Sequence, residues 1–356
     1  MIRVRLRPFL LVVAMLASLP SIARANFIFT VTDLGTLGGS TSHALAVNAS
    51  GQVAGEAMNA AGNYRAFAYW HGTMIDLGTL GGDFSSASGI NDEAQVVGTA
   101  TTAAGKNRAF LFSFATGTMA DLGTLGGDFS GAAAINNHGF VVGKAALPSG
   151  SSRAFFYANG MMYDLGTLGG DFSFATAIDD NNVIVGNART SSIDPMFYQS
   201  GFIFYNGSMF DLSLFGISGR VAIIDVNGVS DAGIAGDADG DPLGGFGPTG
   251  FVTDGNPVNV SSGENLSSES GINEAGVAVG YEDDLDLLHF LFGPQYASIF
   301  AGGVNYDLNT LVDLSGSDFT RLTEAKAISN TGYIVGLGTT TSGATHAFLL
   351  TPIPTP

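Results

Sequence analysis

Acidic and aromatic side chains, the groups in this sequence best suited to chemistry, gather in three long loops. Each loop runs from a recurring glycine to a recurring phenylalanine, and these copies span 16, 15 and 20 positions where four other copies span 12. Insertions on one face of a repeat protein commonly mark its binding side. Carboxylates accept hydrogen bonds from hydroxyls, and rings stack on sugars, so we expect binding to an extracellular glycan, protein or matrix polymer. The candidate binding residues in these loops are Asp194, Tyr198, Phe246, Tyr281, Asp283, Asp284, Asp286 and His289.

The run DADGD at 237–241 places carboxylates at alternate positions, as the first half of a calcium loop does. Asp237, Asp239 and Asp241 are therefore candidate ligands of Ca²⁺, the one cofactor that the sequence suggests. Pro242 stands where an EF-hand loop has its turn glycine, and no glutamate follows at the twelfth place. A solvated acidic loop is the alternative interpretation.

Catalysis is the second hypothesis, and it rests on the same carboxylates. Two acids can hydrolyse a glycosidic bond when they face each other across it. An extracellular carbohydrate-active enzyme would then use Asp241 with Asp283 or Asp284. The five histidines lack metal-ligand spacing, and the sequence contains neither cysteine nor a G-x-S-x-G motif. We therefore favour a non-catalytic binding or structural module, and a purely adhesive protein is a third possibility.

One repeated unit supplies the framework for these loops. The string DLGTLGG begins at Asp33, Asp76, Asp121 and Asp164, at steps of 43 to 45 residues. A second marker, typified by INNHGFVVG, recurs seven times and closes on Gly55, Gly98, Gly143, Gly186, Gly236, Gly280 and Gly336. A third marker is a phenylalanine in an apolar run, and its copies are Phe67, Phe110, Phe155, Phe202, Phe251, Phe300 and Phe348. Phe300 is preferred to the nearby Phe290 because it keeps the period.

Each repeat contains four short apolar runs bounded by turn residues. In the second copy these runs cover 74–80, 86–91, 95–99 and 109–114. Runs rich in Val, Ile and Phe between Gly, Asn, Asp and Ser are typical of strands. Four strands in about 45 residues make one propeller blade, whereas a β-solenoid coil needs about half that length. We predict an all-β β-propeller of seven blades, each of four short antiparallel strands, with the ring closed by the N-terminal strand beside the C-terminal one.

The strand order also predicts which loops share an end of the ring. The connections between the first and second runs emerge at the same end as the three long loops, and the opposite end carries only tight turns. We therefore add three recurring aspartates, each followed by phenylalanine, to the candidate binding face: Asp83, Asp128 and Asp171.

Most repeated polar residues have a structural interpretation. Asn48, Asn91 and Asn136 lie where a tight turn joins two strands, and asparagine bonds its own backbone there. The aspartate of each DLGTLGG string is expected to accept a hydrogen bond at a strand end. Four cationic or titratable residues precede the Ala-Phe marker, and each is expected to pair with a repeated aspartate: Arg65, Arg108, Arg153 and His346.

These markers together resemble the HAF family of bacterial extracellular repeat proteins. The combination is DLGTLGG, then S-x-A-x-x-I-N-x-x-G-x-V-V-G, then H/R-A-F-L, and it covers essentially the whole chain after the first 25 residues. The first four copies match closely and the last three diverge. The resemblance implies export and a propeller-like fold, and it implies no established reaction. Similar proteins often finish with a PEP-CTERM sorting tail, which this sequence does not show before Pro356.

Residues 1–25 have the pattern of a secretory signal peptide. Arg3, Arg5 and Arg7 precede an apolar stretch at 8–20, and Ala23-Arg24-Ala25 forms a small-x-small cleavage site. That stretch is too short for a membrane span of about 20 residues. We predict cleavage after Ala25 and a secreted, periplasmic or extracellular location. The remaining domain plan is a single seven-repeat domain at 26–353 and a tail at 354–356.

The composition and net charge limit the classes of partner that the chain can bind. Removing the four arginines of residues 1–25 leaves 9 basic against 31 acidic residues, a net charge of −22. Such a charge opposes contact with phosphate backbones, so we expect no nucleic-acid partner. Glycine makes up 51 of 356 residues and charged residues 12%, while 46% are hydrophobic, which excludes intrinsic disorder. We expect a monomer without a membrane span.

Overall fold

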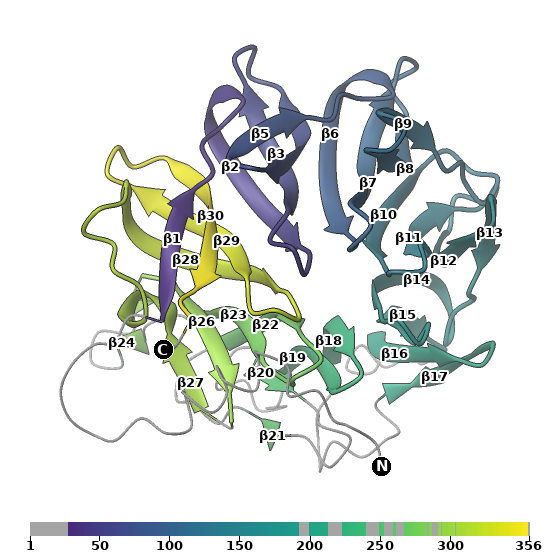
Figure 1. Ribbon diagram of the computed structural model, residues 1–356. Coiled ribbons are helices and arrows are strands. Elements are labelled where there is room, and N and C mark those ends of the chain that lie inside the picture. The colour runs from purple at the N-terminus through teal and green to yellow at the C-terminus, as the bar shows by residue number, and fades with distance from the viewer. Residues whose placement is uncertain are drawn as a thin grey trace, which may run out of the picture.

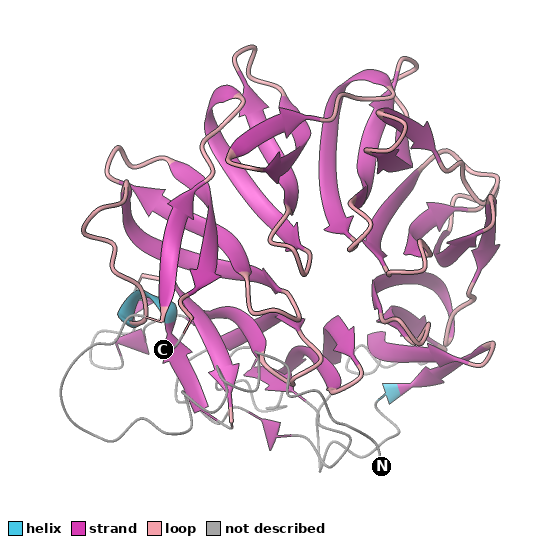
Figure 2. Cartoon of the chain, in the orientation of Figure 1, coloured by secondary structure: helices cyan, strands magenta, loops and turns pink. Residues whose placement is uncertain are grey.

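Short apolar runs separated by glycine- and asparagine-containing turns form β-strands along the chain (Figure 2). The structure is a computed structural model. It describes residues 28–191, 199–212, 223–239, 249–252, 259–260, 267–282, 285–286, 291–292, 294–302 and 304–354.

The described strands form seven four-stranded antiparallel sheets and a separate two-stranded one. Sheet one contains β2 (Gly38–Val47), β3 (Val53–Asn59), β4 (Tyr64–Trp70) and β5 (Thr73–Asp76). Sheet two contains β6 (Gly81–Ile90), β7 (Gln95–Thr102), β8 (Asn107–Ser113) and β9 (Thr118–Asp121). Sheet three contains β10 (Ser130–Ile135), β11 (Val141–Ala146), β12 (Ser152–Ala158) and β13 (Met161–Asp164). Sheet four contains β14 (Gly169–Ile178), β15 (Ile184–Thr190), β16 (Gln199–Tyr205) and β17 (Ser208–Asp211).

The later sheets follow the same order with longer connections. Sheet five contains β18 (Ile223–Ser230), β19 (Gly233–Asp239), β20 (Thr249–Val252) and β21 (Asn259–Val260). Sheet six contains β22 (Ser267–Ile272), β23 (Ala278–Glu282), β26 (Tyr296–Ala301) and β27 (Val304–Asp307), and the small sheet pairs β24 (Leu285–Asp286) with β25 (Leu291–Phe292). Sheet seven contains β28 (Phe319–Ile328), β29 (Ile334–Thr340), β30 (Thr345–Pro352) and β1 (Phe29–Asp33), and a short 3₁₀ turn η3 (Leu308–Thr310) precedes it.

The sheets stand around a central axis, and the chain is a β-propeller (Figure 1). Each sheet packs on the next in chain order, and sheet seven packs on sheet one through β2, β28, β29 and β30. The first strand of each sheet is innermost. The four strands predicted for each repeat are confirmed, but the run predicted first, at 74–80, forms β5 and is the outer strand of the preceding sheet.

The N-terminal strand closes the last sheet, as predicted. All five residues of β1 pair with β30, from Phe29 opposite Pro352 to Asp33 opposite Phe348. The outer strand of this sheet therefore comes from the opposite end of the chain. We call β28, β29, β30 and β1 the closing sheet.

The repeated glycine of the second marker allows two strands to approach closely. The first two strands of every four-stranded sheet carry a register shift near their inner end, as between Ala44 and Ala46. Opposite that bulge, a Cβ at Gly55 would lie 2.0 Å from the His43 carbonyl oxygen, and at Gly98 it would lie 2.0 Å from the Ser86 oxygen. The bulge therefore requires glycine at this position.

The repeated phenylalanine fills the space between neighbouring sheets. Five copies, Phe67, Phe110, Phe155, Phe202 and Phe348, have no exposed surface. Phe300 lies in β26 and is 6% exposed. It pairs with Ala278, however, and Ser298 stands opposite Gly280, where the other sheets have the marker phenylalanine, so the register does not place Phe300 at the predicted marker position. The core is thus a series of clusters between sheets rather than one central mass.

Candidate functional site

The repeated DLGTLGG segment ties each sheet to the next. In the first copy, the Asp33 carboxylate accepts from the Gly35 N–H at 2.8 Å, and the same bond recurs from Gly78 to Asp76. The strand-end role predicted for these aspartates is confirmed at all four copies. A serine that follows the string then bridges two sheets. Ser130 Oγ on β10 donates to the Gly123 carbonyl at 2.5 Å and accepts from the Ala109 N–H of β8 at 2.9 Å.

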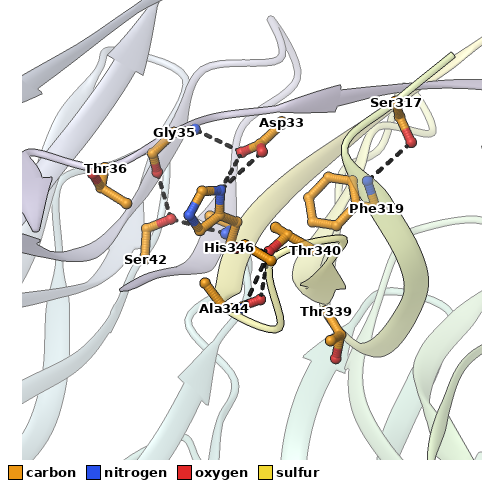
Figure 3. Close-up of polar contacts among 12 residues, drawn as sticks. Asp33, Gly35, Thr36, Ser42, Ser317, Phe319, Thr339, Thr340, Ala344 and His346 are labelled. Atoms are coloured by element: carbon orange, nitrogen blue, oxygen red, sulfur yellow. Dashed lines mark hydrogen bonds and ion pairs between the residues drawn. The ribbon is translucent and has the colours of Figure 1, made fainter. Parts of the chain in front are cut away.

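The cations before the Ala-Phe marker also act between strands. Arg108 Nε lies 3.8 Å from Asp121 Oδ2, and its Nη1 donates to the Asp128 carbonyl of the next sheet at 2.6 Å. His346 Nδ1 lies 2.8 Å from Asp33 Oδ2 (Figure 3). The predicted pairing with a repeated aspartate is confirmed at these two copies. Arg65 Nη1 is buried and has no partner among the described residues.

A set of turns meets at the propeller axis. These turns join the first and second strands of each sheet, and we call them together the turn ring. Seven side-chain hydrogen bonds link each turn to the next around the axis. Asn48 Nδ2 donates to the Asn91 carbonyl at 3.0 Å, and Thr331 Oγ1 returns from the closing sheet to the Ala49 carbonyl at 2.7 Å. Asparagines predicted as local turn residues therefore also connect neighbouring sheets.

The turn ring surrounds a cavity of about 220 Å³, the axial pocket. All seven turns contribute lining residues, and four of the lining groups are the carboxylates of Asp92, Asp180, Asp231 and Glu274. They occupy one equivalent position, directly after the repeated Asn, Asp or Ser, where the other sheets carry Ala49, Asn137 and Asn330. Among the described residues, no lysine, arginine or histidine lines the pocket. Its electrostatic character is strongly acidic.

Hydrogen bonds fix several of these carboxylates in place. Asp92 Oδ1 accepts from the Ala49 N–H at 2.8 Å, and Asp180 Oδ1 accepts from the Asn137 N–H at 2.8 Å. The Asn137 amide donates to the second oxygens of both acids, at 3.1 Å and 3.0 Å. Asp231 Oδ1 accepts from Asn181 Nδ2 at 2.6 Å. The ring therefore presents a preorganised set of acceptors.

Asp179 is a fifth acid at the pocket and differs from its equivalents. It replaces the asparagine of the first three turns and is only 9% exposed. Burial raises the pKa of the Asp179 carboxyl and the negative charges of Asp231 and Asp180 add to the rise, although hydrogen bonds from the Val183 and Asn181 N–H groups oppose it. A buried acid with a raised pKa, set among other acids in a cavity, is a frequent mark of a functional site.

Three predicted binding residues, Asp83, Asp128 and Asp171, lie at the opposite end and are not brought together. Each is exposed and belongs to a different sheet or sheet connection. Two have cationic partners: Lys106 Nζ lies 3.3 Å from Asp128 Oδ2, and Arg189 Nη1 lies 3.0 Å from Asp171 Oδ1. The Arg189 hydrogen bond lowers the pKa of Asp171. These two pairs tie neighbouring segments together.

The long-loop predictions fall largely outside the described residues. Tyr281 lies half-buried in β23, and Asp286 belongs to β24, where the backbone alone is described. The others lie outside the described residues: Asp194, Tyr198, Asp241, Phe246, Asp283, Asp284 and His289.

The candidate calcium ligands begin in a strand rather than in a loop. Asp237 and Asp239 belong to β19, and Asp237 stands opposite Asp225 on β18. Within the described part of the chain, no three His, Asp or Glu side chains are placed to hold a metal ion together. The axial carboxylates are thus arranged around a space rather than around one point. No helix in the described part is long and apolar enough to cross a membrane.

The axial acids were missed by sequence reasoning, although a signal was present. Within closely repeated turns, the position after the asparagine varies as Ala49, Asp92, Asn137 and Asp180. Variation at one position of an otherwise strict repeat indicates that the framework does not dictate it. The turns were interpreted as structural because each looks complete within its own repeat.

Comparisons with known proteins support the fold. No protein-family model and no curated protein matches the sequence. Among solved structures, the chain is similar to the β-propeller domain of the Trilobed protease from Pyrococcus furiosus, with a TM-score of 0.58 and 11% identity over 90% of this chain and 95% of that one. That domain is described as having an open velcro topology. In this chain, β1 pairs with β30 instead.

Two further structures share the fold over part of their length. An acylaminoacyl peptidase from Pyrococcus horikoshii gives a TM-score of 0.52 at 11% identity, over 86% of this chain and 51% of that one. A puromycin-hydrolyzing peptidase from Mycobacterium tuberculosis gives 0.53 at 10% identity, over 92% and 55%. The chain thus spans about half the length of these two proteins. At such identity the likeness concerns the propeller alone.

Proposed function

We propose that this chain is an exported, non-catalytic binding module whose axial pocket holds an extracellular ligand through its amine or hydroxyl groups. One observation carries the proposal: all seven turns meet at a cavity whose described lining contains acids and no cationic side chain. Ligand sites commonly combine a preformed concavity with a few convergent polar groups.

The lining specifies the chemistry of the ligand. Carboxylate and amide oxygens accept hydrogen bonds, so the ligand must donate them. An anionic ligand would meet the negative charges of these acids and be repelled. A protonated amine would make charge-assisted bonds worth about 1.5–3 kcal/mol each. Amino sugars and amine-bearing polymers therefore fit best, and neutral polyols fit second.

The test is retention of the mature protein on immobilised polysaccharides, with soluble products quantified in the same tubes. Chitosan supplies amines, dextran supplies hydroxyls alone and polygalacturonate supplies carboxylates. We expect retention in the order chitosan, dextran, polygalacturonate, without release of oligosaccharides. Retention on polygalacturonate above chitosan would contradict the proposal. Release of oligosaccharides would support the carbohydrate-active enzyme and direct attention to Asp241, Asp283 and Asp284.

Matched variants distinguish the pocket from general charge. Asp92→Asn and Asp180→Asn keep an acceptor for the neighbouring N–H group, as Asn137 and Asn330 do naturally in the same ring. Asp83→Asn removes the same charge from the opposite end. We expect each single axial variant to lose about tenfold or more in affinity for chitosan, since 1.4 kcal/mol corresponds to tenfold. An equal loss of affinity in Asp83→Asn would show that the effect arises from net charge and not from the axial pocket.

The acidic and aromatic loops of the fourth to sixth repeats remain a proposed second surface, with Ca²⁺ at Asp237, Asp239 and Asp241. Repeating the retention assay in calcium and in EDTA tests this part. Loss of retention in EDTA, matched by Asp239→Asn, would support a calcium-dependent surface. Retention that is unchanged by EDTA and by Asp239→Asn would support the axial pocket and not the second surface.

The architecture and location of the module complete the proposal. We take the seven sheets as the seven blades of one closed ring within 26–353, because they pack in chain order and the turn ring returns to its start. The HAF-like repeats and the pattern of residues 1–25 support export of a monomer. Amino-terminal sequencing of the exported protein should begin at Asn26.

A further inference from the structure

A second cavity lies away from the axis, between sheets three and four. Its volume is about 280 Å³, and we call it the junction pocket. Sheet three contributes Phe156 from β12, and sheet four contributes two turns and the strand residues beside them. The described residues that line it are Phe156, Asn181, Asn182, Ile184, Phe204, Tyr205, Asn206 and Gly207.

Aromatic rings continue from this cavity across the facing side of sheet three. His138 stacks on Phe140 at 5.8 Å between centroids, Phe140 meets Phe156 edge-on at 5.3 Å, and Phe156 lies 6.5 Å from Tyr163. Large exposed apolar side chains gather on the same two sheets: Met161 at 56%, Tyr205 at 49%, Tyr163 at 45% and Phe210 at 44%. Exposed aromatic surface beside a cavity marks an interaction site more strongly than single exposed residues do.

The repeat framework does not require these residues. At the position of Phe156, the first two sheets carry Ala68 and Leu111. At the position of Tyr205, sheets one, two and three carry Trp70, Ser113 and Ala158. The third turn likewise has Phe140 where the first two have glutamines that accept from the repeated asparagine. Among the first three sheets, aromatic residues at the Phe140 and Phe156 positions are therefore particular to this junction, whereas the Tyr205 position is also aromatic in sheet one, where Trp70 meets Phe114 edge-on.

The lining selects a class of ligand. No charged residue of the described part of the chain lines the pocket, so a charged ligand would lose hydration without a counter-ion. Three asparagines line it. Asn181 Nδ2 donates to Asp231 and Asn182 Oδ1 accepts from Asn136, so a purely apolar ligand would leave chiefly the Asn206 amide without a partner. The Asn206 side chain makes no hydrogen bond to another described residue, and a positive φ of 51° fixes its turn. Aromatic faces beside the amide of Asn206 match a molecule that has one apolar face and a rim of hydroxyls.

We propose that the junction pocket is a binding site for a single neutral pyranose ring of a glycan. The sugar's C–H face lies on Tyr205 or Phe156, whose ring faces carry negative potential. The Asn206 amide bonds vicinal hydroxyls, and Tyr163 with Met161 contacts the neighbouring residue of a longer chain. The cavity lies near the lower end of the ~300–1,000 Å³ range of ligand pockets, which suits one ring rather than an oligomer. This site is separate from the axial pocket and does not depend on its ligand.

The experiment measures retention of the mature protein on agarose beads bearing glucose, galactose, mannose or N-acetylglucosamine, with glucuronate beads for comparison. We expect retention on at least one neutral sugar, release by the same free sugar, and none on glucuronate. Tyr205→Ala and Asn206→Gly should each reduce retention at least tenfold. Both substitutions suit the fold, because Ala158 occupies the Tyr205 position in sheet three and glycine accepts a positive φ.

The control is Asn159→Gly, which removes the same amide from the same turn position of sheet three, where φ is 54°. It should bind like the unaltered protein. Failure of the unaltered protein to bind any neutral sugar would overturn the proposal, as would equal retention by Tyr205→Ala. Equal losses in Asn206→Gly and Asn159→Gly would also overturn it. The axial variant Asp92→Asn should not change retention here, so this site and the axial pocket can fail independently.

Discussion

The closing sheet and the internal sheets contain the same contacts but are connected differently. In sheet two, β9 follows β8 through a short turn, whereas in the closing sheet β1 reaches β30 from the other end of the chain. The serine bridge is nevertheless reproduced: Ser42 Oγ donates to the Gly35 carbonyl at 2.5 Å and accepts from the Ala347 N–H at 2.9 Å (Figure 3). The repeat thus closes the ring with contacts that elsewhere join covalently adjacent segments.

Within these contacts, sheet two and the closing sheet differ in the cationic or titratable residue that precedes the Ala-Phe marker. Arg108 reaches both the Asp121 carboxylate and a carbonyl of the next sheet, while His346 contacts the Asp33 carboxylate. An outer strand that follows its neighbour through a short turn pairs with it at little cost in entropy. β1 pairs with β30 only by closing a loop that comprises the rest of the domain, which costs more entropy. The closing sheet is therefore where we expect the ring to open first.

Removing β1 should have the largest effect. A chain that begins at Leu34 loses five paired residues and Phe29, which is 2% exposed and packs in the cluster of the closing sheet. Phe29→Ala alone should cost about 3–5 kcal/mol of unfolding free energy. Urea unfolding followed by circular dichroism measures both, and a synthetic peptide of residues 26–34 should restore part of the truncated protein's stability. A truncated chain as stable as the mature one would show that closure by β1 contributes nothing.

The serine bridge allows a matched test of the two junction types. Ser42→Ala and Ser130→Ala each leave a backbone N–H and a carbonyl without their partner, which should cost about 1–3 kcal/mol. If the closing junction opens first, Ser42→Ala should increase amide hydrogen exchange in β1 and β30 ahead of global unfolding. Ser130→Ala should have no such local effect. Identical patterns of hydrogen exchange in the two variants would show that the closing sheet opens no earlier than the internal sheets.

Asp179→Asn tests the turn ring at the fourth junction and should stabilise the protein at neutral pH. The folded-state pKa of Asp179 is raised above its unfolded value of about 3.9, so its carboxyl lowers stability increasingly as pH rises through the interval between the two values. An asparagine there could also donate to sheet five as Asn136 does to sheet four, worth about 0.5–1.5 kcal/mol. The gain measured at pH 7 should shrink on lowering the pH towards 4. A gain that grew on acidification would contradict this assignment.

His346→Arg should have the smallest effect. It gives the closing sheet the cation found at Arg108, and exposed or half-exposed ion pairs contribute about 0–1 kcal/mol. The melting temperature at pH 7 should rise slightly. The reciprocal Arg108→His should lower the melting temperature by a similar amount. A fall for His346→Arg or a rise for Arg108→His would show that the two environments are not equivalent.

Sequence reasoning predicted the fold well because the information it needed was local. Strand number, the tight turns at Asn48 and Asn91 and the pairing of β1 with β30 follow from short patterns repeated along the chain. The boundary of the repeat was misplaced by one strand. A string such as DLGTLGG is contiguous in sequence, yet it ends one sheet and begins the next.

The candidate sites could not be predicted in the same way. Asp92 and Asp180 looked like ordinary turn residues, and the loops with the richest acidic and aromatic content drew attention to the opposite end. Neighbouring turns of the axial pocket are 43 to 56 residues apart in sequence where an asparagine joins them. Phe156 and Tyr205 likewise belong to different repeats, and nothing in either repeat indicates that they share a cavity.

The sequence by itself determined the repeat, the strands within it, their turns and the strand that closes the last sheet. These features depend on backbone conformation and on alternation of buried and exposed side chains, which act over a few residues. Only the tertiary structure decided which side chains of different repeats meet. That depends on how the sheets pack around one axis, because packing brings equivalent positions together while the residues at those positions differ.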